Sequence, residues 1–150
     1  MHKAYLLLGS NMGDRALMLE RALEELGKIG RITAMSARKE TEPWGFEEPV
    51  TSFLNQAVCL ETALDPEKLM EQCLEIERVL GRKREKRQLP STEKKTYYSR
   101  LIDIDILLYD NLKLNTKQLI LPHPRLRERP FAMELLREIL PKNLSLKDFY

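Results

Sequence analysis

The sequence predicts an α+β fold, the ferredoxin-like plait, with a hairpin and a helix added at its C-terminal end. Strand-like and helix-like stretches follow one another in the order β-α-β-β-α-β, which is the order of this plait. In such a plait both helices cover one face of an antiparallel sheet. The 150 residues are enough for one hydrophobic core, so we expect a single domain over residues 1–150.

The four strands are predicted by stretches rich in branched and aliphatic residues, which favour an extended backbone. The second stretch is less regular than the others. In the third, the alternation of side chains places Phe53, Asn55, Ala57 and Cys59 on one face of the sheet. The stretches expected to form strands cover residues 3–9, 31–40, 53–62 and 100–109.

The helices are predicted by apolar residues at intervals of three and four, preceded by polar capping residues. Asp65 is the expected N-cap of the second helix because Pro66 follows it, and Gly81 is that helix's expected end. The turn 10–14 lacks the glycine-lysine-Ser/Thr ending of a P-loop, and we favour a simple strand-to-helix connection over a functional turn. We expect a first helix ending near residue 28, further helices over 65–81 and 131–140, and a hairpin from 112–114 and 118–121.

The stretch 100–109 carries the strongest chemical signal in the chain. Alternate residues from Ile102 to Leu108 are apolar and share one face, which we expect to be a core face. Asp103 and Asp105 then lie together on the opposite face, about 7 Å apart. Such a pair is either simply solvated or binds a cation, and oxygen ligands suit Mg²⁺, which completes its shell with substrate phosphates. We expect this strand beside the first strand, near the sheet centre.

A basic segment precedes this strand. Eight Lys or Arg residues and two Glu residues lie between Arg82 and Arg100, a net charge of +6 in a chain whose total is +2. The segment contains Pro90 and no apolar periodicity, so we expect a mobile loop that an anion visits. An RNA-binding plait would need aromatic residues in its central strands, where this chain has aspartates. A small metal-binding or regulatory domain is the other alternative.

Two further side chains need a partner. Trp44 is the only Trp, and in its polar loop it either fastens the loop or forms a pocket wall. Asn55 lies in an otherwise apolar strand, where an unsatisfied buried amide costs about 1–3 kcal/mol. It therefore either bonds to the backbone of a neighbouring loop or contacts a ligand beside Phe53.

The cysteines and the hydropathy indicate the compartment. Cys59 and Cys73 have neither metal-ligand spacing nor a neighbouring histidine, so we expect two buried free thiols. No apolar run approaches the ~18 residues that span a bilayer. Met1 to Lys3 leads directly into the first strand, so we expect no signal peptide. Together these features predict a cytoplasmic protein without a membrane span.

Five blocks of residues carry a family resemblance, through their order and their spacing. They are Gly9-Ser10-Asn11, Phe53-Leu54-Asn55-Gln56-Ala57, Glu77 with Gly81-Arg82, Arg100-Leu101-Ile102-Asp103-Ile104-Asp105-Ile106-Leu107, and Leu121-Pro122-His123-Pro124 followed by Arg129 and Phe131. Together they resemble the 6-hydroxymethyl-7,8-dihydropterin pyrophosphokinases of the folate pathway, from the first strand to about residue 140.

The resemblance implies that the chain transfers a diphosphate from ATP to the hydroxymethyl group of the pterin and releases AMP. It implies that Asp103 and Asp105 hold two Mg²⁺ ions, and that Arg82 and Arg100 are catalytic with them. The expected partners are these small molecules, without nucleic acid or membrane, and we expect a monomer. For the pterin the resemblance implies contacts from Thr41, Pro43, Trp44, Phe53, Asn55 and Phe131, and for ATP from Glu77, Arg82, Arg100, His123 and Arg129.

Some positions depart from the family pattern. Phe53 stands where the family often has Tyr, which keeps ring stacking and loses a hydroxyl. The resemblance implies that 82–99 is a lid over ATP, but this segment looks longer than in the best-known members. It has Tyr97-Tyr98-Ser99 in place of the common Trp-Gly-Pro, and Pro124 replaces a residue that is often aromatic.

Overall fold

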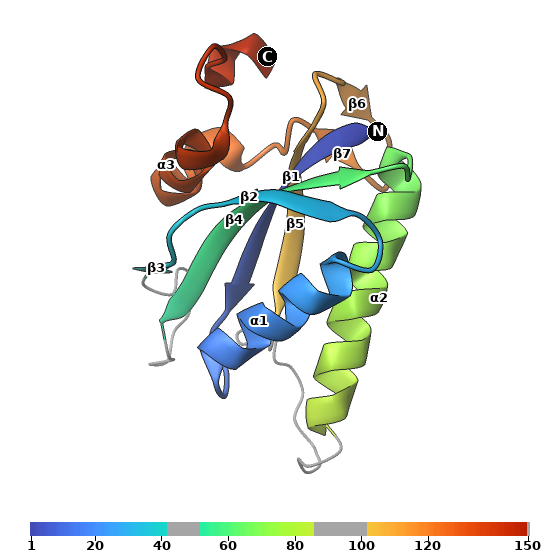
Figure 1. Ribbon diagram of the computed structural model, residues 1–150, viewed down its shortest axis with the longest axis vertical. Helices are drawn as coiled ribbons and strands as arrows, with labels where there is room; N and C mark the ends of the chain where they lie inside the picture. Colours follow the sequence, from blue (N-terminus) through green and yellow to red (C-terminus); the bar gives the residue numbers. More distant parts are fainter. Residues whose placement is uncertain (42–51, 86–101, 150) are drawn as a thin grey trace.

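The computed structural model describes residues 1–41, 52–85 and 102–149 (Figure 1). They form a mixed α and β structure with one main sheet, and each strand pairing in it is antiparallel. The strand order is β2-β4-β1-β5, and β3 pairs with the start of β4. The strands are β1 (His2–Ser10), β2 (Arg31–Met35), β3 (Lys39–Thr41), β4 (Phe53–Thr62) and β5 (Asp103–Tyr109).

Helices cover both faces of this sheet (Figure 1). Two pack on one face, as expected, and a third covers the opposite face together with the C-terminal segment. The small hairpin expected after β5 is also present. These elements are α1 (Arg15–Leu26), α2 (Pro66–Glu85), β6 (Leu114–Asn115), β7 (Ile120–Leu121), η1 (Leu126–Glu128), α3 (Pro130–Ile139) and η2 (Leu146–Phe149).

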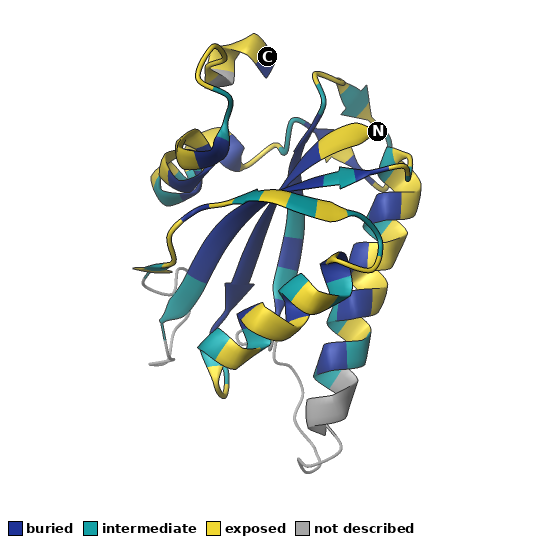
Figure 2. Cartoon of the chain, viewed as in Figure 1, coloured by how far each residue is buried: buried dark blue, intermediate teal, exposed yellow. Residues whose placement is uncertain are grey.

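Each face of the sheet has its own apolar core, which is why the central strands are buried on both sides (Figure 2). The helix-pair core lies under α1 and α2, and the α3-side core lies under α3. Cys73 belongs to the first core and Cys59 to the second, and both are free thiols, as predicted. The helix-pair core includes Leu6, Leu8, Leu19, Leu26, Leu60, Leu69, Ile76, Ile104 and Ile106, and the α3-side core includes Tyr5, Leu7, Ala57, Cys59, Leu107, Leu108, Leu135 and Leu136.

The helix starts follow their capping residues. Asp14 accepts the Leu17 N–H at 3.1 Å, and the predicted cap Asp65 accepts the Lys68 N–H at 2.8 Å. The expected end of α2 at Gly81 is wrong, because the helix continues to Glu85. A glycine inside a helix costs only about 1 kcal/mol, and the Arg and Lys residues that follow are good helix formers.

The irregular second strand is two strands. Ser36 interrupts it and is bonded to β4 through both its backbone and its side chain. Its backbone N–H donates to the Ala57 carbonyl at 2.9 Å, and its hydroxyl accepts the Ala57 N–H at 2.9 Å. The Gln56 side chain donates to the Ser36 carbonyl at 2.9 Å. The break therefore leaves the buried polar groups satisfied and lets β3 form separately.

Two expectations about β5 are wrong. It pairs with β1 as predicted, but it is the edge strand of the sheet and does not lie near the centre. The apolar alternation also ends early: Leu6 pairs with Ile106 whereas Tyr5 pairs with Leu108, so Leu107 is an extra residue in a β-bulge. Leu107 and Leu108 consequently both join the α3-side core, while Ile104 and Ile106 remain in the helix-pair core.

Candidate active site

A row of three residues crosses the sheet and joins the two halves of the predicted site. In the strand register, Gly9 of β1 pairs with Asn55 of β4 on one side and with Asp103 of β5 on the other. Directly opposite residues of antiparallel strands point to the same face, so the Asn55 and Asp103 side chains flank the glycine. Two strand spacings separate them, about 10 Å. A predicted pterin contact and a predicted metal ligand thus lie within reach of one small molecule.

Gly9 itself leaves space in this row. A Cβ on Gly9 would lie 3.0 Å from the Asn55 Oδ1 atom and 3.7 Å from the Phe53 Cδ1 atom. The strand β1 also continues through Gly9 to Ser10 and does not end at the glycine. The first strand therefore continues one residue further at this end than expected, and Gly9 lies between two predicted site residues. A glycine inside a strand often marks a close approach, and that signal was present in the sequence.

The predicted pterin contacts Thr41, Phe53 and Asn55 come together on the two paired strands β3 and β4. Thr41 pairs directly with Phe53. The Asn55 Nδ2 group donates to the Thr41 Oγ1 atom at 2.8 Å and to the Lys39 carbonyl at 3.2 Å. Asn55 therefore bonds to backbone, as one alternative expected, but to the strand β3 and not to a loop, and contact with a ligand stays a prediction. Pro43 and Trp44 lie outside the described residues.

Phe131 comes to the same face from a different element. It lies in the first turn of α3 and packs partly buried against the α3-side core. Two carboxylates hold α3 beside β3: Glu134 lies 3.3 Å from the Lys39 Nζ atom, and Glu138 accepts the Ala37 N–H at 2.9 Å. The helix that carries Phe131 is therefore tied to the segment that leads to Thr41. That the Phe53 and Phe131 rings face each other stays a prediction.

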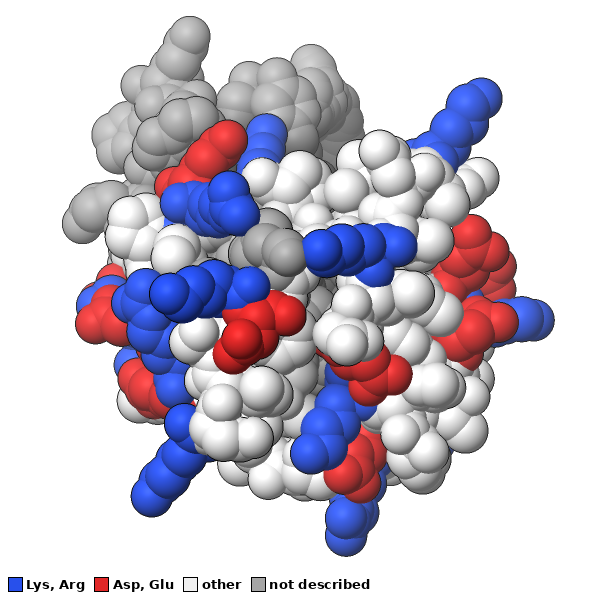
Figure 3. Space-filling view, turned by 90° about the horizontal axis from the view of Figure 1, so that it is seen from above, with Lys and Arg blue, Asp and Glu red and all other residues white. Residues whose placement is uncertain are grey.

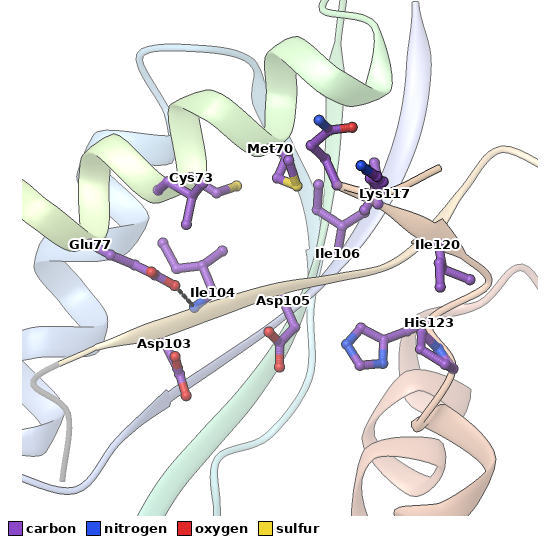
Figure 4. A pocket seen from close by; sticks show the side chains of 14 residues that line it. Met70, Cys73, Glu77, Asp103, Ile104, Asp105, Ile106, Lys117, Ile120 and His123 are labelled. Carbon is purple, nitrogen blue, oxygen red and sulfur yellow. Dashed lines mark hydrogen bonds between the residues drawn. The ribbon is translucent and has the colours of Figure 1, made fainter. Parts of the chain in front are cut away.

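The two aspartates form the other half of the site. Figure 4 shows Asp103 and Asp105 on one side of β5, with Ile104 and Ile106 directed toward α2 on the other. The Arg129 Nη1 atom lies 3.3 Å from the Asp105 Oδ2 atom. Among the described residues, no group of three or more His, Cys, Asp or Glu side chains gathers as a metal cluster. The chain thus offers two carboxylates, which fits Mg²⁺ because that ion keeps water and takes substrate phosphates.

His123 is fixed beside Asp105 by the bulge in β5. Its backbone N–H donates to the carbonyl of the extra residue Leu107 at 2.9 Å, and its ring lies toward Asp105 (Figure 4). The ring Nδ1 atom accepts the Arg125 N–H at 3.1 Å, so a neutral ring carries its proton on Nε2. Burial lowers the pKa of His123; Asp105 opposes this and Arg129 adds to it. His123 is therefore a neutral hydrogen-bond donor near neutral pH.

Glu77 has a structural contact in addition to its predicted role at the nucleotide. Its Oε2 atom accepts the Ile104 N–H at 2.7 Å, which fastens the outer edge of β5 to α2 (Figure 4). The strand that carries the aspartates is thus held from both sides, by β1 and by α2. Contact of Glu77 with ATP stays a prediction. Arg82 lies on α2 but its side chain is outside the described residues, as is Arg100 entirely.

A cavity of about 370 Å³ opens beside the aspartates, between α2, β5 and the β6–β7 hairpin. Leu74 and Ile120, 54% and 40% exposed, lie at its margin, and Cys73 forms part of its wall. Burial, with a smaller contribution from the carboxylates of Glu77 and Asp105, raises the pKa of the Cys73 thiol to about 12. The wall is therefore uncharged at Cys73, while Glu77, Asp103, Asp105 and Lys117 bring charged groups to the rest of the lining.

The class of protein follows from this arrangement. Two carboxylates suited to Mg²⁺, with an arginine and a histidine beside them at the edge of a cavity, are typical of transferases that take a phosphate-containing group from a nucleotide. A comparison with protein families then identifies the particular one. The chain belongs to the 7,8-dihydro-6-hydroxymethylpterin-pyrophosphokinase family, whose model matches residues 5–141.

Named relatives agree with this family. A 2-amino-4-hydroxy-6-hydroxymethyldihydropteridine pyrophosphokinase from Methylorubrum extorquens is 45% identical over 143 residues, covering 94% of this chain and 84% of the relative. The protein of the same name from Porphyromonas gingivalis is 42% identical over 142 residues, covering 91% of this chain and 90% of the relative. These relatives are pyrophosphokinases, which are transferases.

Solved structures support the fold. A crystal structure of an HPPK-DHPS chain in complex with substrates matches with a TM-score of 0.70 at 14% sequence identity. The match covers 97% of this chain and 41% of the other, so this chain spans about two fifths of that longer protein.

None of the helices in the described ranges is long and apolar enough to cross a bilayer. On the described part of the face in Figure 3, Lys and Arg are interspersed with Asp and Glu.

Proposed function

We propose that this chain transfers a diphosphate from ATP to the hydroxymethyl group of 6-hydroxymethyl-7,8-dihydropterin and releases AMP, a step of folate biosynthesis. The observation that carries the proposal is the Gly9 row, which sets Asn55 and Asp103 on one face about 10 Å apart. A pterin bonded at Asn55 would direct its hydroxymethyl arm across the bare glycine toward β5. The ATP phosphates would lie there, beside the cavity that takes the nucleoside.

The reaction has a simple balance of bonds. The hydroxymethyl oxygen attacks the β-phosphorus of ATP and loses its proton. The bond between that phosphorus and the oxygen bridging to the α-phosphate breaks, and AMP leaves with this oxygen. Phosphoryl transfer of this kind depends on positioning and on neutralising charge more than on covalent help from side chains.

Asp103 and Asp105 would hold Mg²⁺, and two ions are expected. When bound, Mg²⁺ neutralises phosphate charge and lowers the pKa of the attacking hydroxyl group. Arg129 already lies 3.3 Å from Asp105 and offers its remaining N–H groups to a phosphate. His123 offers its Nε2–H group to a phosphate oxygen without adding charge, because its Nδ1 atom is already engaged. Arg82 and Arg100 would act on the phosphates from the basic segment.

The pterin end would work by stacking and hydrogen bonding. Phe53 and Phe131 would cover the two faces of the ring, each worth about 1–3 kcal/mol by analogy with stacked nucleobases. Thr41 and Asn55 would bond the ring edge, and Pro43 and Trp44 would complete the pocket. Glu77 would contact the nucleotide near the strand edge that it fastens.

We also propose a fold type, a domain organisation, an oligomeric state and a cellular compartment for this chain. The order β2-β4-β1-β5, with α1 and α2 on one face, supports the ferredoxin-like plait. We infer a single domain that works as a monomer in the cytoplasm, on small molecules and not on nucleic acid.

The test is the formation of AMP. The full chain with Mg²⁺ and ATP should release AMP only when 6-hydroxymethyl-7,8-dihydropterin is present, with one diphosphorylated pterin per AMP. Omitting the pterin, omitting Mg²⁺, or substituting pterin without the hydroxymethyl group are the controls. AMP formation independent of the pterin, or transfer of a single phosphate with release of ADP, would overturn the proposal.

A further inference from the structure

Arg15 makes three polar contacts from the start of α1. Its Nη2 atom donates to the Glu40 Oε2 atom at 2.7 Å. Its Nη1 atom donates to the Ser52 carbonyl at 2.9 Å and to the Ser52 hydroxyl at 3.2 Å. The Arg15 side chain is only 24% exposed and its bonds to Ser52 are partly buried, whereas its partner Glu40 is 57% exposed. The guanidinium group is thus held between one sheltered partner and one that faces solvent.

The partners of Arg15 stand directly before two proposed pterin contacts. Glu40 precedes Thr41 on β3, and Ser52 precedes Phe53 on β4. Glu40 pairs with a β4 residue, Leu54, whose side chain packs against the helix-pair core, so Glu40 points to the α1 face of the sheet. Thr41 and Phe53, one position further, point to the opposite face. Arg15 therefore acts from behind the sheet and does not enter the site.

The strand β3 is short, with three residues that all pair with β4. Contacts from Lys39 and Ala37 to two carboxylates of α3 hold it toward that helix, and Arg15 adds a contact from the α1 side of the sheet. The Asn55 amide depends on β3 for both of its bonds, to the Lys39 carbonyl and the Thr41 hydroxyl. A small shift of β3 along β4 would turn this amide and change what it presents to a ligand.

We propose that Arg15 is a positioning residue for the pterin site: by joining Glu40 to Ser52 it fixes β3 on β4 and so sets the orientation of the Thr41–Asn55 pair. The inference rests on the proposed function, since it takes the pterin as the ligand. The guanidinium group is suited to this because its planar fork reaches two partners at once. A lysine at this position keeps the charge but has a single donor group.

The experiment compares KM for the pterin with KM for ATP, and kcat, in Arg15→Gln, Arg15→Lys, Glu40→Gln and a matched control. The control is Arg31→Gln, which removes an exposed ion pair to Glu61, 3.2 Å long, at the other end of the same sheet. Removing a charge-assisted bond in Arg15→Gln should raise KM for the pterin about tenfold, with KM for ATP changed less than about twofold.

The other variants sharpen this result. Arg15→Lys should behave much like Arg15→Gln, and Glu40→Gln should raise the pterin KM by about threefold, since the neutral amide still accepts a bond. Fluorescence titration with 6-hydroxymethylpterin, in the presence of Mg²⁺ and a non-hydrolysable ATP analogue, should show the same loss of affinity. Arg31→Gln should change neither constant. If Arg15→Gln fails to fold, Arg15→Lys and Glu40→Gln carry the same comparison.

The contrary results are distinct. A wild-type protein that forms no pterin-dependent AMP overturns the proposed function, and this inference with it. An active wild type whose Arg15 variants lose melting temperature but keep the pterin KM shows a role in stability alone and overturns the inference by itself. Equal rises in the KM for the pterin and the KM for ATP would also overturn the inference, because positioning of β3 by Arg15 should raise the KM for the pterin only.

Discussion

The pterin end and the phosphate end of the site lie on one face of the same sheet but are organised by different interactions. At the pterin end, neutral groups satisfy one another, as where Asn55 donates to Thr41 at 2.8 Å. At the phosphate end, Asp103 and Asp105 are like charges on one edge strand, with Arg129 at 3.3 Å from Asp105 and a neutral His123 nearby. The pterin end is ordered by its own hydrogen bonds. The phosphate end carries negative charge that a bound cation and its phosphates can neutralise.

The two ends should therefore obtain their binding energy in different ways. A flat, neutral ring gains from groups that are already in place, because the protein has met the entropic cost of ordering them during folding. A polyphosphate with its Mg²⁺ needs charged side chains that the protein does not fully pair with one another. The cost is repulsion between the two aspartates when no cation is bound. Changes at the pterin end should therefore weaken affinity for one substrate, whereas changes at the phosphate end should reduce the rate.

The largest effect is expected at the aspartates. Asp103→Ala and Asp105→Ala should each lower kcat at least about a hundredfold, since each removes a ligand of the expected Mg²⁺. The melting temperature without Mg²⁺ should stay the same or rise slightly in Asp103→Ala, because one of two like charges is gone, and should fall slightly in Asp105→Ala, which also loses the ion pair to Arg129. Steady-state kinetics and a thermal melt measure both. A variant that keeps more than a tenth of the wild-type rate would contradict the metal site.

A smaller and different effect is expected from Asn55→Ala. It should raise the pterin KM by about thirtyfold, from the loss of hydrogen bonds to the ring edge, and leave the ATP KM within about twofold. Kinetics with each substrate varied in turn measure this. A fall in kcat like that of the aspartate variants, with an unchanged pterin KM, would contradict the expectation that the pterin end sets affinity and the phosphate end sets the rate.

Gly9→Ala tests the residue that lies between the pterin end and the phosphate end. The new Cβ would lie 3.0 Å from the Asn55 Oδ1 atom, so the amide has to move by a few tenths of an ångström. We expect a rise of about fivefold in the pterin KM, in line with a strained but not broken bond. Gly27→Ala, where the nearest contact of a Cβ is 3.4 Å, is the matched control and should leave the kinetics unchanged. Equal effects from both variants would remove Gly9 from the site.

The smallest effect is expected at the cavity wall. Cys73→Ala should change kcat by less than about twofold, because a thiol whose pKa is raised to about 12 by burial stays protonated and does no chemistry. In the native protein its alkylation by iodoacetamide at pH 8 should therefore be much slower than in the denatured chain. Peptide mapping measures this, with the denatured chain as control. Fast alkylation of Cys73 at pH 8 would show that the wall is open or charged.

The sequence could predict most of the strands and the aspartate pair from local periodicity, and the caps from the residue types that favour helix starts. The single strand expected over 31–40 is instead two strands. It could not predict the bulge at Leu107, since Ile106, Leu107 and Leu108 are all apolar and no polar residue marks the change of face. The edge position of β5 depends on strand order, which no single stretch encodes. The helix continued past Gly81 because good helix formers follow it.

The site was predicted residue by residue but not as a geometry. The Gly9 row depends on the register of three strands far apart in the chain, so the sequence placed Gly9 only at the end of the first strand and not between two predicted site residues. Arg15 has the sequence appearance of a solvated charge in a first helical turn, and only the paired strands show what it holds. The expected contacts from Pro43, Trp44 and Arg100 lie outside the described residues and stay predictions.

We infer that one row of the sheet joins the pterin end to the phosphate end, and a paramagnetic ion at the aspartates can test this. With Mn²⁺ in place of Mg²⁺ and a non-hydrolysable ATP analogue bound, the side-chain amide signal of Asn55 in ¹⁵N-labelled protein should broaden strongly. The reason is that Asn55 lies about 10 Å from Asp103 across two strand spacings. The Mg²⁺ complex and the double variant Asp103→Asn/Asp105→Asn should both keep the signal sharp. An Asn55 signal that is equally sharp with Mn²⁺ and with Mg²⁺ would show that the metal does not bind on the same row of the sheet as Asn55.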